Sequence, residues 1–198
     1  SGTTCRIENN TSFTVTATPV CNAPTTQLSI GSPSSTATSM TIPVTAGNGD
    51  SRLIRFNTSA ASLTPTNGNT YSATTAYATA GTEQTVMAGS GSSVTVTSLV
   101  ANTVYYYKAW EYNACSSSPK YNTTSAPSGN FTTLSNAPTV GTGSNATSSS
   151  FDAAWSAPAA QGSATYTYEV QVDDDPLFGS VDFTQSAIAS STSSLNVN

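Results

Sequence analysis

Residues 93–107, which read SVTVTSLVANTVYYY, decide the fold of this chain. In the first half of the stretch, Val94 and Val96 alternate with threonines, and a period of two is the mark of a β-strand with one buried face. In the second half, Tyr105 and Tyr107 are two residues apart, so both point to the same side of an extended segment. The stretch therefore predicts two strands joined by a short loop.

The same alternation recurs along the rest of the chain. Rows of this kind occupy residues 13–17, 40–44, 54–56, 151–155 and 166–172, and clusters of Gly, Asn, Asp and Pro at 46–50, 65–68, 88–91 and 173–176 separate them. Many short strands with regular turn signals predict an all-β, antiparallel sandwich or barrel. Pro43 lacks the N–H of a sheet ladder, so we expect a bulge or an edge position there.

The composition of the 198 residues excludes several classes of function. The chain has no histidine, which excludes a Ser-His-Asp triad and a His-ligated zinc site. Its five Lys and Arg residues are scattered, so nucleic acid is not an expected partner. No apolar run is long enough for a membrane span.

Carboxylates give no site that we expect to be functional. Asp173, Asp174 and Asp175 suit a calcium ion in kind, but a polar turn before Pro176 is the simpler interpretation. Glu83, Glu111 and Glu169 lie in unrelated segments, with no pairing of the sort that glycosidases use. We therefore expect no enzyme, no catalytic residue, no metal and no cofactor.

An internal repeat divides the chain. Residues 13–25 read FTVTATPVCNAPT and residues 131–139 read FTTLSNAPT, each a Thr-rich strand followed by Asn-Ala-Pro-Thr. A second parallel follows, between residues 36–42 (TATSMTI) and 145–151 (NATSSSF). Such repeats indicate tandem copies of one unit, and the Asn-Ala-Pro segments indicate the linkers.

The deciding stretch resembles the fifth strand, loop and sixth strand of fibronectin type III domains. In that family Leu99 would fill the core, and Tyr105 would be the corner tyrosine whose hydroxyl bonds to nearby backbone. Trp155 matches the core tryptophan of the family in the last unit, whereas the middle unit has Val44 at that place. The middle unit also resembles a longer variant found in secreted bacterial surface proteins. The resemblance implies immunoglobulin-like sandwiches in tandem.

The resemblance also implies where the units lie. Residues 22–134 form a complete domain with a long insert, residues 135–198 supply the first strands of a further domain, and residues 1–21 supply the last two strands of a preceding one. Two explanations stay open. The chain is a window of a longer tandem array, or the last strands of one copy complete the sandwich of the next, which would build a head-to-tail filament.

The three cysteines, Cys5, Cys21 and Cys115, form no Cys-x-x-Cys pair. Cys5 and Cys21 flank the two strands of the leading unit, so we expect a disulfide between them. Cys115 would then be free or would pair between units. A disulfide fits an oxidising, extracellular or cell-surface location.

An aromatic stripe is the candidate ligand-binding surface. Tyr106, Trp110 and Tyr112 should point away from the core face of their strand. Such a stripe can stack sugar rings, but we expect the insert of residues 57–90 to fold over it instead.

The sequence thus predicts a non-enzymatic structural or adhesive module. Its partners would be neighbouring domains or copies of the same protein. The alternative is a carbohydrate-binding accessory module of a secreted hydrolase, with polysaccharide as its partner.

Overall fold

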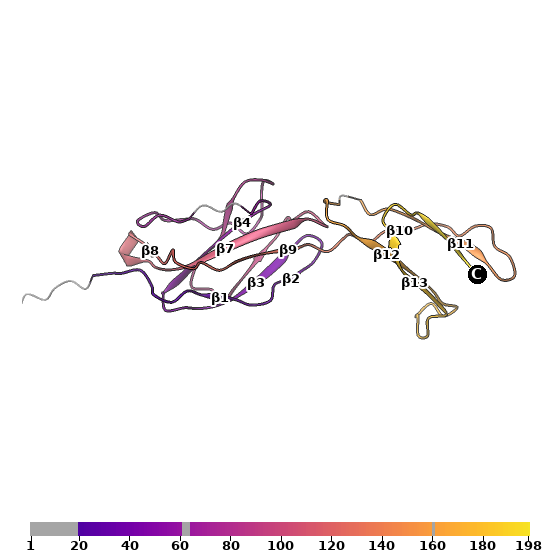
Figure 1. Cartoon of the computed structure of the whole chain (residues 1–198), viewed down its shortest axis with the longest axis horizontal. Helices are drawn as coiled ribbons and strands as arrows, with labels where there is room; N and C mark the ends of the chain where they lie inside the picture. The colour runs from indigo at the N-terminus through magenta and orange to yellow at the C-terminus, as the bar shows by residue number, and fades with distance from the viewer. Residues whose placement is uncertain (1–19, 61–63, 160) are drawn as a thin grey trace, which may run out of the picture.

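The computed structural model describes residues 20–60, 64–159 and 161–198, and these ranges contain fourteen β-strands, one short 3-10 turn (Cys115–Ser117) and no α-helix. The strands form two units that follow each other along the long axis of the molecule (Figure 1). The first unit contains β1 to β9 and the second contains β10 to β14. The strand expected at residues 13–17 lies outside the described residues.

Two antiparallel sheets make up the first unit. One contains β1 (Ser29–Ile30), β2 (Ser34–Ser35), β3 (Met40–Thr45) and β6 (Ser93–Val96). The other contains β4 (Ser51–Asn57), β5 (Gln84–Gly89), β7 (Val104–Asn113), β8 (Lys120–Tyr121) and β9 (Ser128–Thr132). The long strands β3 and β7 are rich in β-branched and aromatic residues, which suit a half-buried pleated surface.

The core of the first unit lies between these sheets. Alternate side chains of the strands fill it, as a period of two requires. They are Met40, Ile42 and Val44 of β3, Val94 and Val96 of β6, Ile54 and Phe56 of β4, and Tyr105, Tyr107 and Ala109 of β7. None of these side chains is more than 8% exposed. The alternation read from the sequence is therefore confirmed.

The strand order is that of an immunoglobulin-like sandwich. If β1 and β2 are taken as one interrupted strand, the first sheet pairs the first, second and fifth strands, and the other places the fourth, third, sixth and seventh side by side. The backbone N–H of Val100 donates to the hydroxyl oxygen of Tyr105 at 2.9 Å. This hydrogen bond confirms the corner expected at Tyr105.

Pro43 does not lie on an edge, but the irregularity expected there is present on the neighbouring strand. The register shifts by one residue between Ile30↔Val44 and Ser34↔Thr41, so residues 31–33 bulge opposite residues 42–43. Pro43 itself sits within β3, the middle strand of its sheet, opposite Ser93. The N–H of Val44 points toward β6, because it donates to Ser92 O. The N of Pro43 therefore faces the other neighbour, and there the pairing is interrupted between β1 and β2. The proline is accommodated because the missing donor faces this gap.

Cys21 forms a disulfide with Cys115, and their Cα atoms are 5.6 Å apart. The predicted pair of Cys5 and Cys21 is therefore wrong, and Cys5 lies outside the described residues. The cause is a contact between distant segments. Asn113, at the end of β7, donates from its side chain to Asn22 O at 2.9 Å and so holds the start of the first unit beside Cys115.

The second unit repeats part of the plan of the first. One sheet contains β10 (Thr139–Val140), β11 (Phe151–Ser156) and β14 (Ser194–Val197), and a separate pair contains β12 (Thr167–Val172) and β13 (Phe183–Ala189). Trp155, Tyr168 and Ile188 form its small core. Trp155 is 8% exposed on β11, the second strand of this unit, which confirms its core position.

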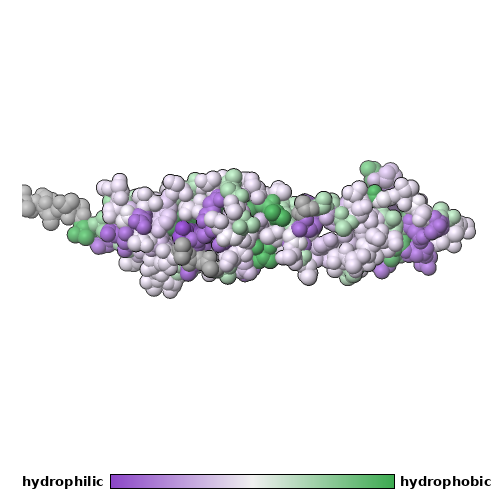
Figure 2. Space-filling model, turned by 90° about the horizontal axis from the view of Figure 1, so that it is seen from above, coloured by the Kyte–Doolittle hydropathy of each residue, from purple (hydrophilic) through white to green (hydrophobic). Residues whose placement is uncertain are grey.

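The surface is weakly polar. Figure 2 shows mostly pale residues with a few separate hydrophobic patches, as the abundance of Ser and Thr would produce. The described residues contain no helix long and apolar enough to cross a membrane.

Candidate functional site

The two units meet at a joint made mainly of backbone. The loop between β6 and β7 lies beside the loop between β11 and β12, where Ala101 and Gln161 form a parallel bridge. Gly162 N donates to Ala101 O at 2.7 Å, and Ala164 N donates to Asn102 O at 3.1 Å. The side-chain amide of Asn102 also donates to the carbonyl oxygens of Gly162 and Ala164. Asn102 is only 3% exposed, so this contact is shielded from water.

Gly162 is the closest point of the joint. A Cβ atom at this position would lie 2.6 Å from Asn102 O and closer still to Thr103 Oγ1. Real Cβ atoms essentially never approach backbone so closely, and only a glycine fits here without a shift. The Asn102 backbone has φ +52°, a conformation that Asn tolerates better than most residues.

The segment that links the units is also held at its start. Thr133 is 2% exposed, and its N–H donates to Thr103 O at 3.1 Å. Leu134 N donates to Thr36 O at 3.1 Å. Beyond it, the side chain of Asn136 donates to Ala159 O at 2.9 Å. The segment between β9 and β10 is therefore hydrogen-bonded to the first unit at its start and to the second unit at Asn136.

The predicted aromatic stripe is not a binding surface as a whole. Trp110 is fully buried, and it packs with Leu53 and Tyr121 beneath the partly buried Tyr71. The ring of Tyr112 lies 5.0 Å from that of Tyr121. Of the expected ligand-binding residues, Trp110 is thus a core residue and Tyr112 packs against the cover. Part of the cover comes from the insert, as expected, but Tyr121 comes from β8.

Tyr106 lies apart from that cover, at a hollow of about 380 Å³ on the outer face of the β4–β7–β9 sheet. Asn57, Lys108 and Asn130 also line the hollow. At its rim, Arg55 Nη1 and Glu83 Oε2 are 2.9 Å apart. Proteins bind sugars with a flat aromatic ring beside amides and charged groups, and the hollow offers these groups. Tyr106 is, however, the single aromatic residue of the predicted stripe that lines it.

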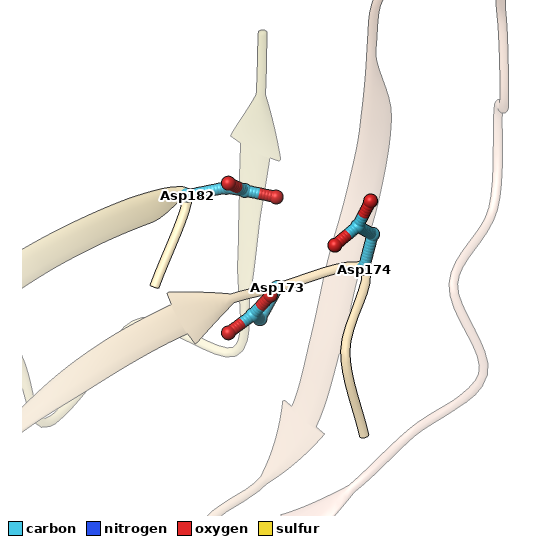
Figure 3. A group of neighbouring side chains, drawn as sticks. All are labelled: Asp173, Asp174 and Asp182. Carbon is cyan, nitrogen blue, oxygen red and sulfur yellow. The ribbon is translucent and has the colours of Figure 1, made fainter. Parts of the chain in front are cut away.

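Three aspartates converge at the turn between β12 and β13. Figure 3 shows the carboxylates of Asp173 and Asp174 after β12 and that of Asp182 before β13, with ligand-type oxygens within 4.8 Å of one another. Asp175 points into the turn instead, because its carboxylate accepts from Leu177 N at 3.0 Å. Asp173 accepts from Asp175 N at 3.0 Å. These hydrogen bonds fit the polar turn read from the sequence.

The glutamates considered as a glycosidase pair are engaged separately. Glu111 is buried near Arg52 and accepts from Gly47 N at 3.1 Å. Glu83 pairs with Arg55, and Glu169 accepts from Ser186 in the second unit. The structure does not bring them together.

The second unit has an open sheet edge. In the first unit β4 pairs with β5 on one side and with β7 on the other, whereas β12 pairs with β13 alone among the described strands. A hollow of about 340 Å³ opens between the two sheets, lined by side chains that include Val140, Trp155, Tyr168 and Phe178. Val140 is 84% exposed and Phe178 51%, so apolar surface borders the hollow.

Sequence reasoning missed several of these residues. Asn102, Gly162 and Tyr77 carry no motif, and their roles depend on contacts between distant segments. Tyr77 comes from the insert, yet it packs edge-on against Phe56 and Tyr105 in the main core. The local signal was the tyrosine itself, one of a few large apolar residues in an insert rich in Ser, Thr and Ala.

Comparisons with known proteins found similar solved structures that include β-sandwich proteins. No protein-family model and no curated protein matches the chain. Among solved structures, a segment of two fibronectin type III domains from chicken tenascin is 14% identical with a TM-score of 0.42, covering 89% of this chain and 82% of that one. The FN1–FN3 domains of chicken CNTN1 are 12% identical with a TM-score of 0.38, covering 89% and 57%. A redesigned β-sandwich protein is 21% identical with a TM-score of 0.34, covering 56% and 93%. The fold assignment rests on the strand order and core described above.

Proposed function

We propose that this chain is a non-enzymatic structural module of an extracellular or cell-surface protein, in which serial sandwiches hold their neighbours at a fixed spacing and orientation. The units would be residues 22–134 and 135–198, preceded by the end of another sandwich in residues 1–21. The observation that supports this function best is the joint between Asn102 and the 161–164 loop.

The joint supports a spacer because its contacts fix an angle as well as a distance. Backbone hydrogen bonds at Gly162 and Ala164 come from one loop, and the amide of Asn136 adds a third contact on the linker. Contacts from two segments resist both bending and twisting. Domain pairs move relative to each other by default unless a large, hydrophobic interface joins them, so in this pair the hydrogen bonds of the joint would have to hold the orientation.

The disulfide supports an extracellular or cell-surface location. Cys21–Cys115 closes almost the whole first unit, and such bonds persist in oxidising surroundings outside the cytosol. The low content of charged residues, 8%, is compatible with this setting. The adhesive role remains a proposal of the same kind, since a spacer presents its terminal domains to partners.

The relative orientation of the units tests the function. Spin labels on β5 and β13 should give one narrow distance distribution in the unaltered chain. Asn102→Gly keeps the positive φ but removes the side-chain amide, and it should broaden the distribution. Asn48→Gly removes an amide that binds Thr25 and Thr26 at a loop away from the joint, and it should leave the distribution narrow. A broad distribution in the unaltered chain would refute the spacer.

Carbohydrate binding is the second candidate, and the hollow at Tyr106 supports it. Glycan binding that saturates, and that Tyr106→Ala abolishes while Tyr112→Ala does not, would favour this function. Trp110→Ala is unsuitable as the probe, because Trp110 is a core side chain.

A further inference from the structure

Among the described residues, one edge of β12 has no neighbouring strand. The second unit has counterparts of β1, β3 and β6 in β10, β11 and β14, and counterparts of β4 and β5 in β12 and β13. The described residues contain no counterpart of β7 or β9 in this unit. In the first unit β7 pairs with β4 over seven residue pairs, from Ser51↔Tyr112 to Asn57↔Tyr106. At the corresponding edge of β12, no strand of the described ranges accepts or donates backbone hydrogen bonds.

The hollow beside this edge is lined by side chains that a neighbouring strand could cover. Trp155 and Tyr168 are more than nine-tenths buried and border the hollow, where the Tyr168 hydroxyl interacts with Trp155 and Tyr166 without a hydrogen bond of ideal geometry. Val170 also faces the hollow, and it is only partly buried. Val140 and Phe178 leave apolar surface in water at the same hollow, so an occupant that covers it would stabilise the unit.

The first unit shows what such an occupant looks like. There the space between the sheets is filled from β7 by Tyr105, Tyr107 and Ala109, and beside it β9 contributes the partly buried Phe131. The occupant of the second unit is therefore an antiparallel strand with alternate apolar side chains, followed by a second strand with an aromatic residue. Strand addition to an open edge is a known mode of recognition.

Residues 1–19 carry this pattern in the same chain. The repeat aligns Phe13 with Phe131 of β9, and Val15 and Ala17 continue the alternation. The stretch from Cys5 to Ile7 precedes it, as β7 precedes β9.

Residues 1–19 could reach β12 of their own copy only if the chain turned back along the whole first unit. This segment joins the first unit at Cys21, which is tied to Cys115 just beyond the end of β7. The joint lies at the start of β7, which is about 34 Å away for a ten-residue strand. The second unit extends beyond the joint, away from the end at which the chain enters (Figure 1). A second copy can present the segment directly.

We infer that the edge of β12 and the hollow at Trp155 bind residues 1–19 of a second copy, so that copies associate head to tail. The inference rests on the proposed structural function and adds its partner. A contact of this kind does not close on itself, and it generates open chains. Phe13 of the incoming segment would fill the place that Phe131 fills in the first unit.

Sedimentation of the full chain tests this inference, in a Cys5→Ser background that excludes dimers linked through Cys5. The sedimentation coefficient should rise with concentration without a fixed limit. An excess of a peptide of residues 1–19 should return it to that of a single copy, and the same peptide with Phe13→Asp should not. Hydrogen exchange at the β12 amides should slow when the peptide binds.

Two pairs of variants make the test specific. Val170→Asp places a charge in the hollow and should abolish association. Thr167→Asp is the control, because Thr167 is an exposed residue of the same strand that does not line the hollow, and it should leave association intact. Phe13→Asp should also abolish association, and Thr14→Asp is its control. Both changes leave the second unit unaltered, so this pair still tests the inference if Val170→Asp prevents the second unit from folding.

The outcomes separate the possible occupants. In one outcome, Val170→Asp abolishes association, whereas neither the peptide nor Phe13→Asp affects it. That result would show that two β12 edges pair with each other, and it would overturn the inference. A chain that neither associates nor binds the peptide would also overturn it. The proposed spacer would survive both results, because its test measures the joint within a single copy.

Discussion

The backbone N–H of Gly162 donates to the carbonyl oxygen of Ala101 at 2.7 Å, across the joint between the two units. This contact depends on the absence of a side chain at Gly162, since a Cβ atom would meet Asn102 O at 2.6 Å. The joint is thus a close approach of backbone to backbone, and its geometry is sensitive to one methyl group.

Gly162→Ala should separate the two units without unfolding either of them. The added methyl group cannot be accommodated against Asn102 and Thr103, so the loop must withdraw and its hydrogen bonds break. Residual dipolar couplings of the two units should then require two alignment tensors instead of one. Gly143→Ala is the matched control in the second unit, because its Cβ would make only ordinary contacts, the nearest at 3.5 Å.

Removing the disulfide should lower the stability of the first unit. The bond joins residues 94 positions apart, and closing a loop of about that length stabilises a fold by roughly 4–5 kcal/mol in the chain-entropy view. Urea unfolding of Cys21→Ala should show a loss of that order, and Cys5→Ser should show none. Peptide mapping without reductant should recover Cys21 linked to Cys115. A fragment linking Cys21 to Cys5 would contradict the structure.

Tyr105→Phe should cost about 1 kcal/mol of unfolding free energy, because the N–H of Val100 loses its acceptor while the ring still fills the core. Tyr106→Phe is the neighbouring control. Tyr106 points to the outer face of the same strand, and its change should leave the urea midpoint unaltered. Equal effects of the two substitutions would argue against the corner.

Alkaline pH should destabilise the first unit through Tyr121. Burial, followed by the neighbouring Tyr112 and Tyr71, raises the pKa of Tyr121 from 10.0 to about 12. The unfolded chain therefore ionises this phenol first, and the stability contributed by the neutral form, complete below pH 10, is lost as the pH rises toward 12. Burial also raises the pKa values of Tyr105 and Tyr107, which act in the same direction.

Thermal unfolding on either side of this pH range measures the effect. Tyr121→Phe removes the hydrogen bond to Asn69 O and lowers the stability somewhat at neutral pH, but it should reduce the dependence on pH above 10. A variant with the full alkaline loss would show that Tyr121 does not carry it.

The strands and the core face of β7 could be predicted from the sequence, because a period of two is a local property. Val94, Val96 and Tyr105 each reveal their side of the sheet through their neighbours alone. The position of Trp155 followed from its row of alternating residues. These predictions needed no knowledge of which strands pair.

The contacts between distant segments could not be predicted in this way. The partner of Cys21 depends on where the end of β7 lies, and no local pattern encodes it. The gap that accommodates Pro43 belongs to a different strand. Trp110 has the spacing of an outward residue, and it does point outward, but β8 and the insert bury it. The joint at Gly162 arises only when two folded units meet.

The disulfide also decides what happens when the chain is pulled from both sides of the first unit. Tension that enters near residue 20 passes across Cys21–Cys115 and bypasses the strands between them. Even after the sandwich unfolds, only the stretch from residue 116 to the linker can extend under tension, by about 6–7 nm at roughly 3.5 Å per residue. A unit with the disulfide reduced would extend by several times that length, so the disulfide limits how far the first unit lengthens when it unfolds under tension.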